Sequence, residues 1–137
     1  SDKYIGIFNT LTISNYFRTK KIVATDATKS EDIVPYTDIF SASFLKRGFV
    51  MHPTRKAFWL SPIEWISVNE CVQWVWENRN YKIATRENAV AGIMMAHGHG
   101  IHKFNDFKEQ VNQALIKAGI EPILLTWEAV DDLYFTE

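Results

Sequence analysis

Three of the four histidines in the chain lie within the six-residue segment His97-Gly98-His99-Gly100-Ile101-His102. Imidazole is a common ligand of transition metals, and glycine lets a backbone approach a bound ion closely. On an extended chain His97 and His99 would point to the same side, and a turn could bring His102 to the same ion. The segment therefore predicts a candidate zinc or manganese site, with a divalent-metal-dependent hydrolase or nuclease as the corresponding function.

The spacing of this segment resembles the H-x-H-x-D-H metal motif of the metallo-β-lactamase superfamily. His97, His99 and His102 stand at its three histidine positions, and Ile101 stands where the motif has aspartate. The resemblance implies a strand over residues 90–96, a helix from Asn105 and a second strand at 122–125. It also implies a metal-bound site at the three histidines.

A simpler interpretation of the segment needs no metal, and it is the one we favour. Alanine and methionine favour helix, so residues 86–97 are predicted to be helical. His97 would then lie on the apolar face one turn after Ile93, near a helix C-terminus, where a protonated imidazole is stabilised. Gly98 would cap this helix, while His99 and His102 would lie in a loop. No cofactor is expected on this interpretation.

Other reactive residue types in the sequence have ordinary structural interpretations. Cys71 is the only cysteine, which excludes an internal disulfide and favours a reducing compartment. It falls on an apolar stripe with Val68 and Val72, so we expect a core thiol rather than a nucleophile. His52 is interpreted as a turn residue beside a proline, and the acidic pair 131–132 as a solvated pair without a role.

Tryptophan is the second unusual feature, with five in 137 residues. On a helix that carries the stripe of Val68 and Val72, Trp74 and Trp76 cannot both face the core. At least one of Trp65, Trp74 and Trp76 should therefore be exposed. Exposed tryptophans often anchor interfaces, so these three residues predict a protein partner or self-association.

Basic residues are concentrated in the first half of the chain, although the formal net charge is −1. Residues 1–56 carry nine Lys and Arg against five Asp and Glu, and residues 57–137 carry six against eleven. Basic side chains interleaved with aromatic ones can bind single-stranded nucleic acid. A second alternative function is therefore a nucleic-acid-binding domain that uses Arg18, Lys20, Lys21, Arg55 and Lys56.

The order of the expected elements favours a single α+β domain over residues 1–137. Its small, mainly antiparallel sheet would come from the N-terminal half and would be packed by three to four helices. Strands are expected at residues 4–8, 10–13, 22–24, 49–51, 57–60, 81–83 and 122–125. Helices are expected at residues 38–47, from 62 or 68 onward, at 86–97, 105–118 and 127–134.

The function favoured by the sequence is a non-catalytic protein-binding module, because no complete catalytic set, phosphate loop or nucleophile elbow is visible. A composition rich in Asn, Ile, Lys and aromatic residues favours an accessory or inhibitor protein, including the viral kind. The longest apolar run, residues 89–96, is too short to span a bilayer. We therefore expect a cytoplasmic protein with no membrane association and no small-molecule cofactor.

Overall fold

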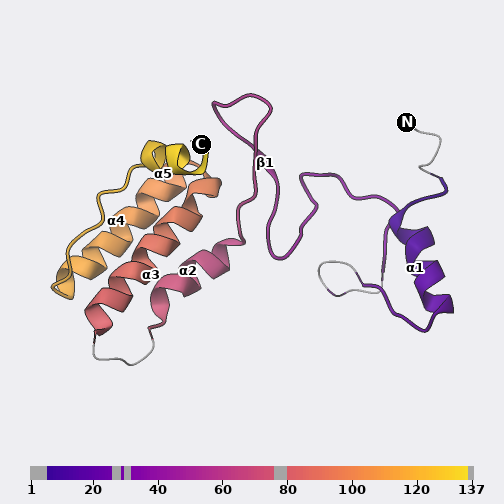
Figure 1. The fold of residues 1–137 in the computed structure, drawn as a ribbon, viewed down its shortest axis with the longest axis horizontal. Coiled ribbons are helices and arrows are strands. Elements are labelled where there is room, and N and C mark those ends of the chain that lie inside the picture. Colours follow the sequence, from indigo (N-terminus) through magenta and orange to yellow (C-terminus); the bar gives the residue numbers. More distant parts are fainter. Residues whose placement is uncertain (1–5, 26–28, 30–31, 76–79, 136–137) are drawn as a thin grey trace. The chain divides into compact units, whose positions relative to one another are not determined.

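Five α-helices, a short 3-10 helix and a two-stranded antiparallel sheet make up the described part of the chain, so the α+β class is confirmed. The computed structural model describes residues 6–25, 29, 32–75 and 80–135. The chain divides into two compact units, Ser1–Phe49 and Val50–Glu137, and each is described by itself (Figure 1). One domain over residues 1–137 stays a prediction, and the expected number of helices and N-terminal sheet are not confirmed.

The N-terminal unit contains one helix, α1 (Thr10–Thr19), where the sequence predicted a strand at residues 10–13. That prediction was wrong because a capping box outweighs four residues of alternation. The Asn9 side chain accepts the Thr12 backbone N–H at 3.0 Å, and the Asn9 N–H is accepted by the Thr12 hydroxyl at 3.1 Å. The two bonds satisfy donors that would be unpaired at the helix start.

The helix expected at residues 38–47 is also absent from the described residues, which form turns there. The Asp38 carboxylate accepts the Phe40 N–H at 2.8 Å, a local bond that competes with helix formation. Phe44 and Arg47 form an isolated antiparallel bridge, with positive φ at the two residues between them. Residues 22–24 form no strand, and the strand expected from residue 4 lies partly outside the described residues.

The C-terminal unit begins with the predicted hairpin of β1 (Val50–Met51) and β2 (Trp59–Leu60). The strands are antiparallel, with Val50 opposite Leu60 and Met51 opposite Trp59. The hairpin prediction is therefore confirmed, and its loop carries His52 and Arg55 towards the helices of this unit.

Two packed helices follow the hairpin, α2 (Trp65–Gln73) and α3 (Tyr81–Ala96). Helix α2 begins between the two predicted starts. Helix α3 confirms the helix predicted to begin at residue 86, but it also includes residues 81–83, where the strand prediction was wrong. A three-residue segment is too short to distinguish a strand from a first helical turn. Helix α3 also excludes the strand over residues 90–96 that the metallo-β-lactamase resemblance implied.

The 3-10 helix η2 (His97–His99) leads into α4 (Ile101–Lys117), which begins four residues before the predicted start. The end of α4 is as predicted: Gly119 has φ 65°, and the Ile120 N–H donates to the Leu115 carbonyl at 2.9 Å. This is a Schellman motif with its apolar residue buried.

Residues 122–125 form no strand, and the last helix, α5 (Trp127–Phe135), agrees with the expected helix at 127–134. The Asn112 side chain accepts the Ile123 N–H at 2.8 Å and donates to the Ile123 carbonyl at 3.0 Å. The Asn112 side chain thus pairs with the backbone groups of Ile123 that a neighbouring strand would otherwise bind. None of the helices in the described ranges is both long and apolar enough to cross a bilayer.

The core lies among α2, α3, α4 and α5. Its fully buried large side chains are Phe104, Ile93, Val68 and Val130. Gly92 allows α2 and α3 to approach, since a Cβ there would lie 2.6 Å from a methyl of Val72. These packed helices carry candidate functional residues of the C-terminal unit.

Candidate functional site

Asp131 of α5 is the centre of a polar cluster in the C-terminal unit. Its side chain is 6% exposed. One carboxylate oxygen accepts from His52 Nε2 at 2.7 Å and from His97 Nε2 at 3.0 Å, while the other accepts from Arg55 Nε at 2.8 Å. One carboxylate therefore joins α5 to the hairpin loop and to the end of α3.

The hairpin loop fixes the tautomer of the His52 ring, which is fully buried. Its Nδ1 accepts the backbone N–H of Arg55 at 2.8 Å and of Thr54 at 3.2 Å. Nε2 must then carry the proton that it donates to Asp131. His52 organises its own turn, as the sequence suggested, and it also reaches α5, which the sequence did not indicate.

His97 is held on both its ring and its backbone. The ring stacks on the Trp127 indole, with centroids 4.6 Å apart and planes at 19°. The Trp127 Nε1–H donates to the His97 carbonyl at 3.0 Å. With the bond to Asp131, these contacts fix His97 as the link between α3 and α5.

Burial and hydrogen bonding shift the pKa values in this cluster in different directions. Burial lowers the pKa of His97, and its bond to Asp131 offsets this only in part. Burial by itself would raise the pKa of Asp131, but the donors His52 and Arg55 outweigh it, so that pKa lies below its usual range. The hydrogen bond to Asp131 raises the pKa of Arg55. Near neutral pH the cluster therefore holds a carboxylate, a guanidinium and a neutral His97 ring.

The rest of the histidine segment also has structural roles. His99 Nε2 donates to the Ile63 carbonyl at 2.7 Å, and burial lowers the pKa of this ring. A Cβ on Gly98 would lie 2.9 Å from the Pro62 side chain, so the close approach needs glycine. Gly100 has φ 91°, which favours glycine, and it precedes the first turn of α4.

The three histidines predicted as metal ligands have separate environments. His97 binds Asp131, His99 binds the Ile63 carbonyl, and His102 is exposed on α4. Within residues 6–25, 29, 32–75 and 80–135, no group of three or more His, Cys, Asp or Glu side chains could hold a metal ion. The structure therefore does not assemble the predicted site.

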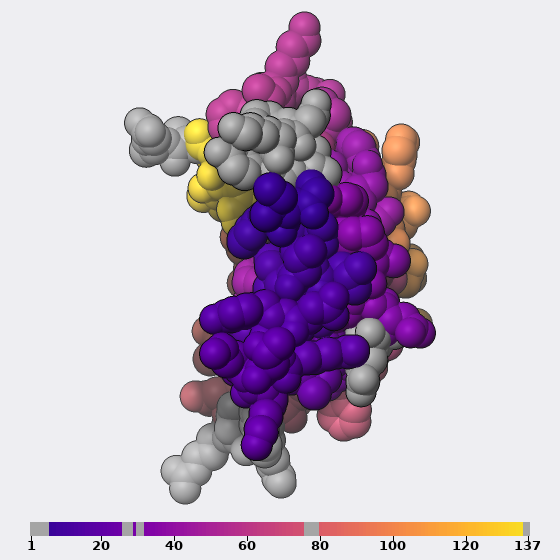
Figure 2. All heavy atoms as spheres, turned by 90° about the vertical axis from the view of Figure 1, so that its right-hand side faces the viewer, coloured from indigo at the N-terminus to yellow at the C-terminus, as the bar shows by residue number. Residues whose placement is uncertain are grey.

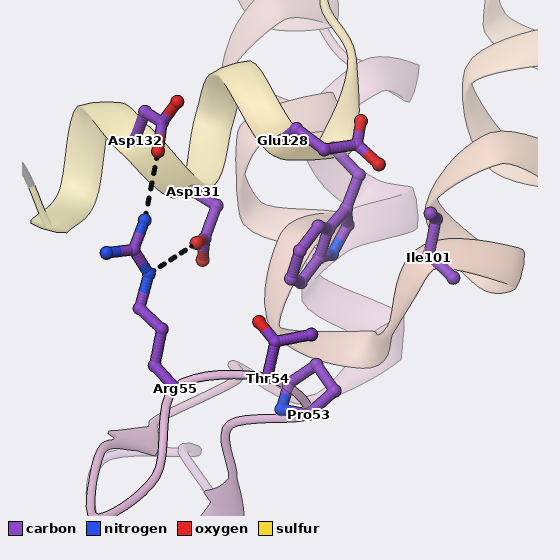
Figure 3. A pocket seen from close by; sticks show the side chains of 8 residues that line it. Pro53, Thr54, Arg55, Ile101, Glu128, Asp131 and Asp132 are labelled. Atoms are coloured by element: carbon purple, nitrogen blue, oxygen red, sulfur yellow. Dashed lines mark hydrogen bonds and ion pairs between the residues drawn. The ribbon is translucent and has the colours of Figure 1, made fainter.

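A pocket of about 430 Å³ lies beside the cluster, between the hairpin loop and α5. In Figure 3 the Arg55 side chain lies along one side of the pocket, and its dashed bonds reach Asp131 and Asp132. Pro53, Ile101 and Trp127 supply apolar lining. The pocket combines an apolar wall with an acidic rim whose charge Arg55 partly neutralises.

The three tryptophans predicted as interface anchors differ in exposure. Trp65 is half-buried, edge-on to Phe107 at 5.3 Å, with Lys103 Nζ 4.0 Å from its ring centroid. Trp74 is 76% exposed, while the Asn88 side chain donates to its carbonyl at 2.8 Å. Trp76 lies outside the described residues. Trp74 is thus an exposed tryptophan of the kind expected, and an interface at it stays a prediction.

Cys71 and the basic residues complete the predicted candidates. Cys71 is half-buried, and burial raises the pKa of its thiol, which agrees with an unreactive cysteine. Arg18, Lys20 and Lys21 are exposed in the N-terminal unit, whereas the other two predicted basic residues, 55 and 56, belong to the C-terminal unit. The two groups belong to different units, so a common basic face stays a prediction.

Asp131 is the residue that the sequence reasoning missed. It was interpreted as half of a solvated acidic pair, but it lies four residues after Trp127 and next to Val130, and all three are buried. An acid at this position of an amphipathic helix must face the core beside the apolar residues. That placement, together with a histidine and an arginine in the hairpin loop, was the sequence signal that could have indicated a buried, hydrogen-bonded Asp131.

Comparison with known proteins places similar sequences in viral polyproteins. No protein-family model matches the chain. The genome polyprotein of Deformed wing virus is 36% identical over 132 residues, covering 96% of this chain. That of Rice tungro spherical virus (strain Vt6) is 26% identical over 129 residues, covering 93%. The RNA1 polyprotein of Satsuma dwarf virus is 27% identical over 134 residues, covering 96%. The chain spans 4–6% of the length of these polyproteins.

A solved structure shares the fold. The "Sicinivirus 3Dpol RNA dependent RNA polymerase" superposes with a TM-score of 0.74 over 93% of this chain, at 19% identity, and the match covers 26% of that chain. The polyprotein similarities support the predicted viral protein. The predicted accessory or inhibitor role finds no support in these comparisons.

Proposed function

We propose that the chain is a segment of a viral RNA-dependent RNA polymerase. The fold similarity to the sicinivirus polymerase carries the proposal, because 93% coverage of this chain includes residues of both units. The similarity to viral polyproteins, detected independently in the sequence, supports the same assignment. Because the match covers 26% of that polymerase, we propose a part of the enzyme rather than the whole.

Within the polymerase, we propose that the C-terminal unit supplies a rigid framework. The Asp131 cluster ties the hairpin loop to α5 and to the end of α3 through three hydrogen bonds. In the described chain, no buried side-chain nitrogen or oxygen lacks a hydrogen-bond partner. A fully paired buried network holds its elements in one arrangement, which a polymerase needs if this unit is to position RNA or its neighbouring segments.

The experiment is a primer-extension assay on the longer viral protein that contains this segment. We expect template-dependent nucleotide incorporation, which should be lost when residues 50–137 are deleted. Asp131→Asn should lower incorporation because the buried cluster is weakened, while Asp132→Asn, whose side chain is 70% exposed, serves as the matched control. A folded longer protein that incorporates nothing, or works equally well without residues 50–137, would overturn the proposal.

A second proposed activity is RNA contact by the exposed basic residues, the alternative raised by the sequence. Arg18, Lys20 and Lys21 lie at or just after the end of α1 and are exposed, as is Lys56 in the hairpin loop. Each lysine that contacts a phosphate should add about one to the salt dependence of binding.

Fluorescence anisotropy with labelled single-stranded RNA tests this contact. The double variant Lys20→Gln/Lys21→Gln should bind more weakly and reduce the slope of log K against log salt by about two. Lys117→Gln, at the exposed end of α4, is the control. Equal slopes for the parent and the double variant would exclude contact through these lysines.

A further inference from the structure

Hydrophobic burial is distributed very unevenly between the two units. The buried hydrophobic residues of the described chain run from Leu60 to Val130, so all of them belong to Val50–Glu137. In the described residues of Ser1–Phe49, the buried residue is a serine, Ser14. The described part of this unit therefore lacks the apolar burial that stabilises a fold.

Large apolar side chains are nevertheless present in the N-terminal unit, and they face solvent. Phe8 is 71% exposed and Leu45 is 76% exposed. Figure 2 draws the described residues of this unit as indigo and purple spheres. Contiguous apolar surface in a soluble protein usually marks a site that another structure covers.

The exposed apolar residues form a defined groove along α1. A pocket of about 420 Å³ is lined by Ile7, Phe8, Ile13, Tyr16 and Phe17, together with the side chain at position 12. Positions 12, 13, 16 and 17 share one helix face. The Tyr16 and Phe17 rings lie 6.1 Å apart, so the groove has an aromatic wall.

The groove is suited to an apolar rather than a polar occupant. Thr12, one of the two hydroxyl-bearing residues that line the groove from α1, already donates within the unit, with the Ile7 and Asn9 carbonyls 3.0 and 2.9 Å away. Lys20 Nζ lies 5.7 Å from the Tyr16 ring centroid, which places a cation beside the aromatic wall. An apolar centre with a charged edge is the usual anatomy of a protein interface.

We propose that this α1 groove, lined by Ile7, Phe8, Ile13, Tyr16 and Phe17, is an intramolecular docking surface for a further segment of the same polymerase chain. The proposal rests on the proposed function, because the similar polymerase is much longer than the 26% matched here. A covalently linked segment is present at high effective concentration and needs little intrinsic affinity. It would insert apolar side chains between Phe8 and the Tyr16–Phe17 wall.

Hydrogen exchange measured on the 137-residue chain and on the longer viral protein tests the docking. Amides of Thr10–Thr19 should exchange at least about 100-fold more slowly in the longer protein, since docking suppresses local opening. Amides of α3 and α4 should exchange similarly in both. Phe8→Ser and Phe17→Ser should remove the protection in the longer protein, whereas Asn15→Ser, an exposed α1 position, should retain it.

Four outcomes would overturn the docking. They are protection already present in the 137-residue chain at every concentration, protection that grows with its concentration, protection only with phosphatidylcholine vesicles, and no protection in the longer protein. In the first three cases the α1 groove would be covered by Val50–Glu137, by a second copy of the chain and by a lipid surface, in that order. In the fourth case nothing would cover it. Primer extension on the same preparation separates the two proposals: activity with unprotected α1 sinks the docking alone, and protection without activity sinks the polymerase assignment alone.

Discussion

At the scale of single residues, the Asp131 side chain links α5 to the hairpin loop and to the end of α3. It accepts three hydrogen bonds, two from histidines whose rings are almost fully buried. Removing a buried acceptor leaves its donors unpaired, and that penalty is larger than the strength of any one bond. The cost of truncation should therefore fall on Asp131 and not on its exposed neighbour.

We predict that Asp131→Ala lowers the free energy of unfolding by about 3 kcal/mol. Asp132→Ala should change it little, because its bond to Arg55 Nη2 is exposed. Urea denaturation followed by tryptophan fluorescence measures both. Equal losses of unfolding free energy in the two variants would show that the buried Asp131 cluster stabilises the fold no more than the exposed bond of Asp132.

The histidines give the protein a predictable dependence on pH. Burial lowers the pKa of both His97 and His99 in the folded chain, so the unfolded chain binds more protons as pH falls below about 6.5. The contribution of these two neutral rings to the free energy of unfolding is therefore fully present above about pH 6.5. It is lost as the pH falls through the lowered pKa values of His97 and His99 in the folded chain. Asp131, whose pKa is also lowered, should add a second loss below about pH 4.

Chemical denaturation at a series of pH values between 7.5 and 5 measures the histidine effect. His99→Gln should flatten the decline in unfolding free energy, because one titrating group is removed. His102→Gln, at an exposed position of α4, is the control variant. A parent whose stability rises on acidification across this range would contradict the assignment.

At the scale of elements, the junction from α3 through η2 into α4 depends on two glycines for different reasons. Gly98 makes room for Pro62, and Gly100 has a positive φ of 91° at the start of α4. A side chain at Gly100 would force a strained backbone and shift the His97–His99 turn. The conformation of the histidine segment therefore depends on the two glycines as well as on the hydrogen bonds of the histidine rings.

We predict that Gly100→Ala lowers the free energy of unfolding by about 1–2 kcal/mol. The matched control is Gly48→Ala, where a Cβ would meet nothing within 4 Å and φ is not positive. Thermal melts of the two variants beside the parent provide the comparison. If both variants melt like the parent, the junction tolerates a side chain, and the strain inferred at Gly100 is absent.

At the scale of the whole molecule, Trp74 remains the candidate anchor for association. Trp74 is 76% exposed, and the Asn88 side chain donates to its backbone carbonyl at 2.8 Å. A tryptophan side chain buries a large apolar area when a partner covers it. Trp65, which packs on Phe107, is the corresponding core-edge residue.

If Trp74 anchors self-association or a protein partner, Trp74→Ala should weaken that binding by about 2 kcal/mol or more with little loss of stability. Trp65→Ala should instead cost about 3 kcal/mol of folding stability. Sedimentation velocity and thermal melts on both variants separate the two effects. A Trp74→Ala chain that associates like the parent would remove this interface.

Local signals in the sequence determined several elements correctly. The hairpin at residues 50–60 and the end of α4 at Gly119 and Ile120 were predictable because their bonds join residues close in sequence. The strand predicted at residues 10–13 was wrong, although the deciding signal was also local. The capping box of Asn9 and Thr12 outweighs the alternation of four residues. A viral origin was suggested by composition, whereas the similarity to a polymerase fold was not.

The role of the histidine segment was decided only by the tertiary structure. His97 and Asp131 are 34 residues apart in sequence, and His52 and Asp131 are 79 apart, yet they share one carboxylate oxygen. No local pattern reports which distant partner a ring nitrogen will find. Packing of α5 against the end of α3 and the hairpin loop brought the Asp131 carboxylate to His97 and His52. One ring of the segment thus joins a buried hydrogen-bonded network, while His99 binds the Ile63 carbonyl and His102 is exposed.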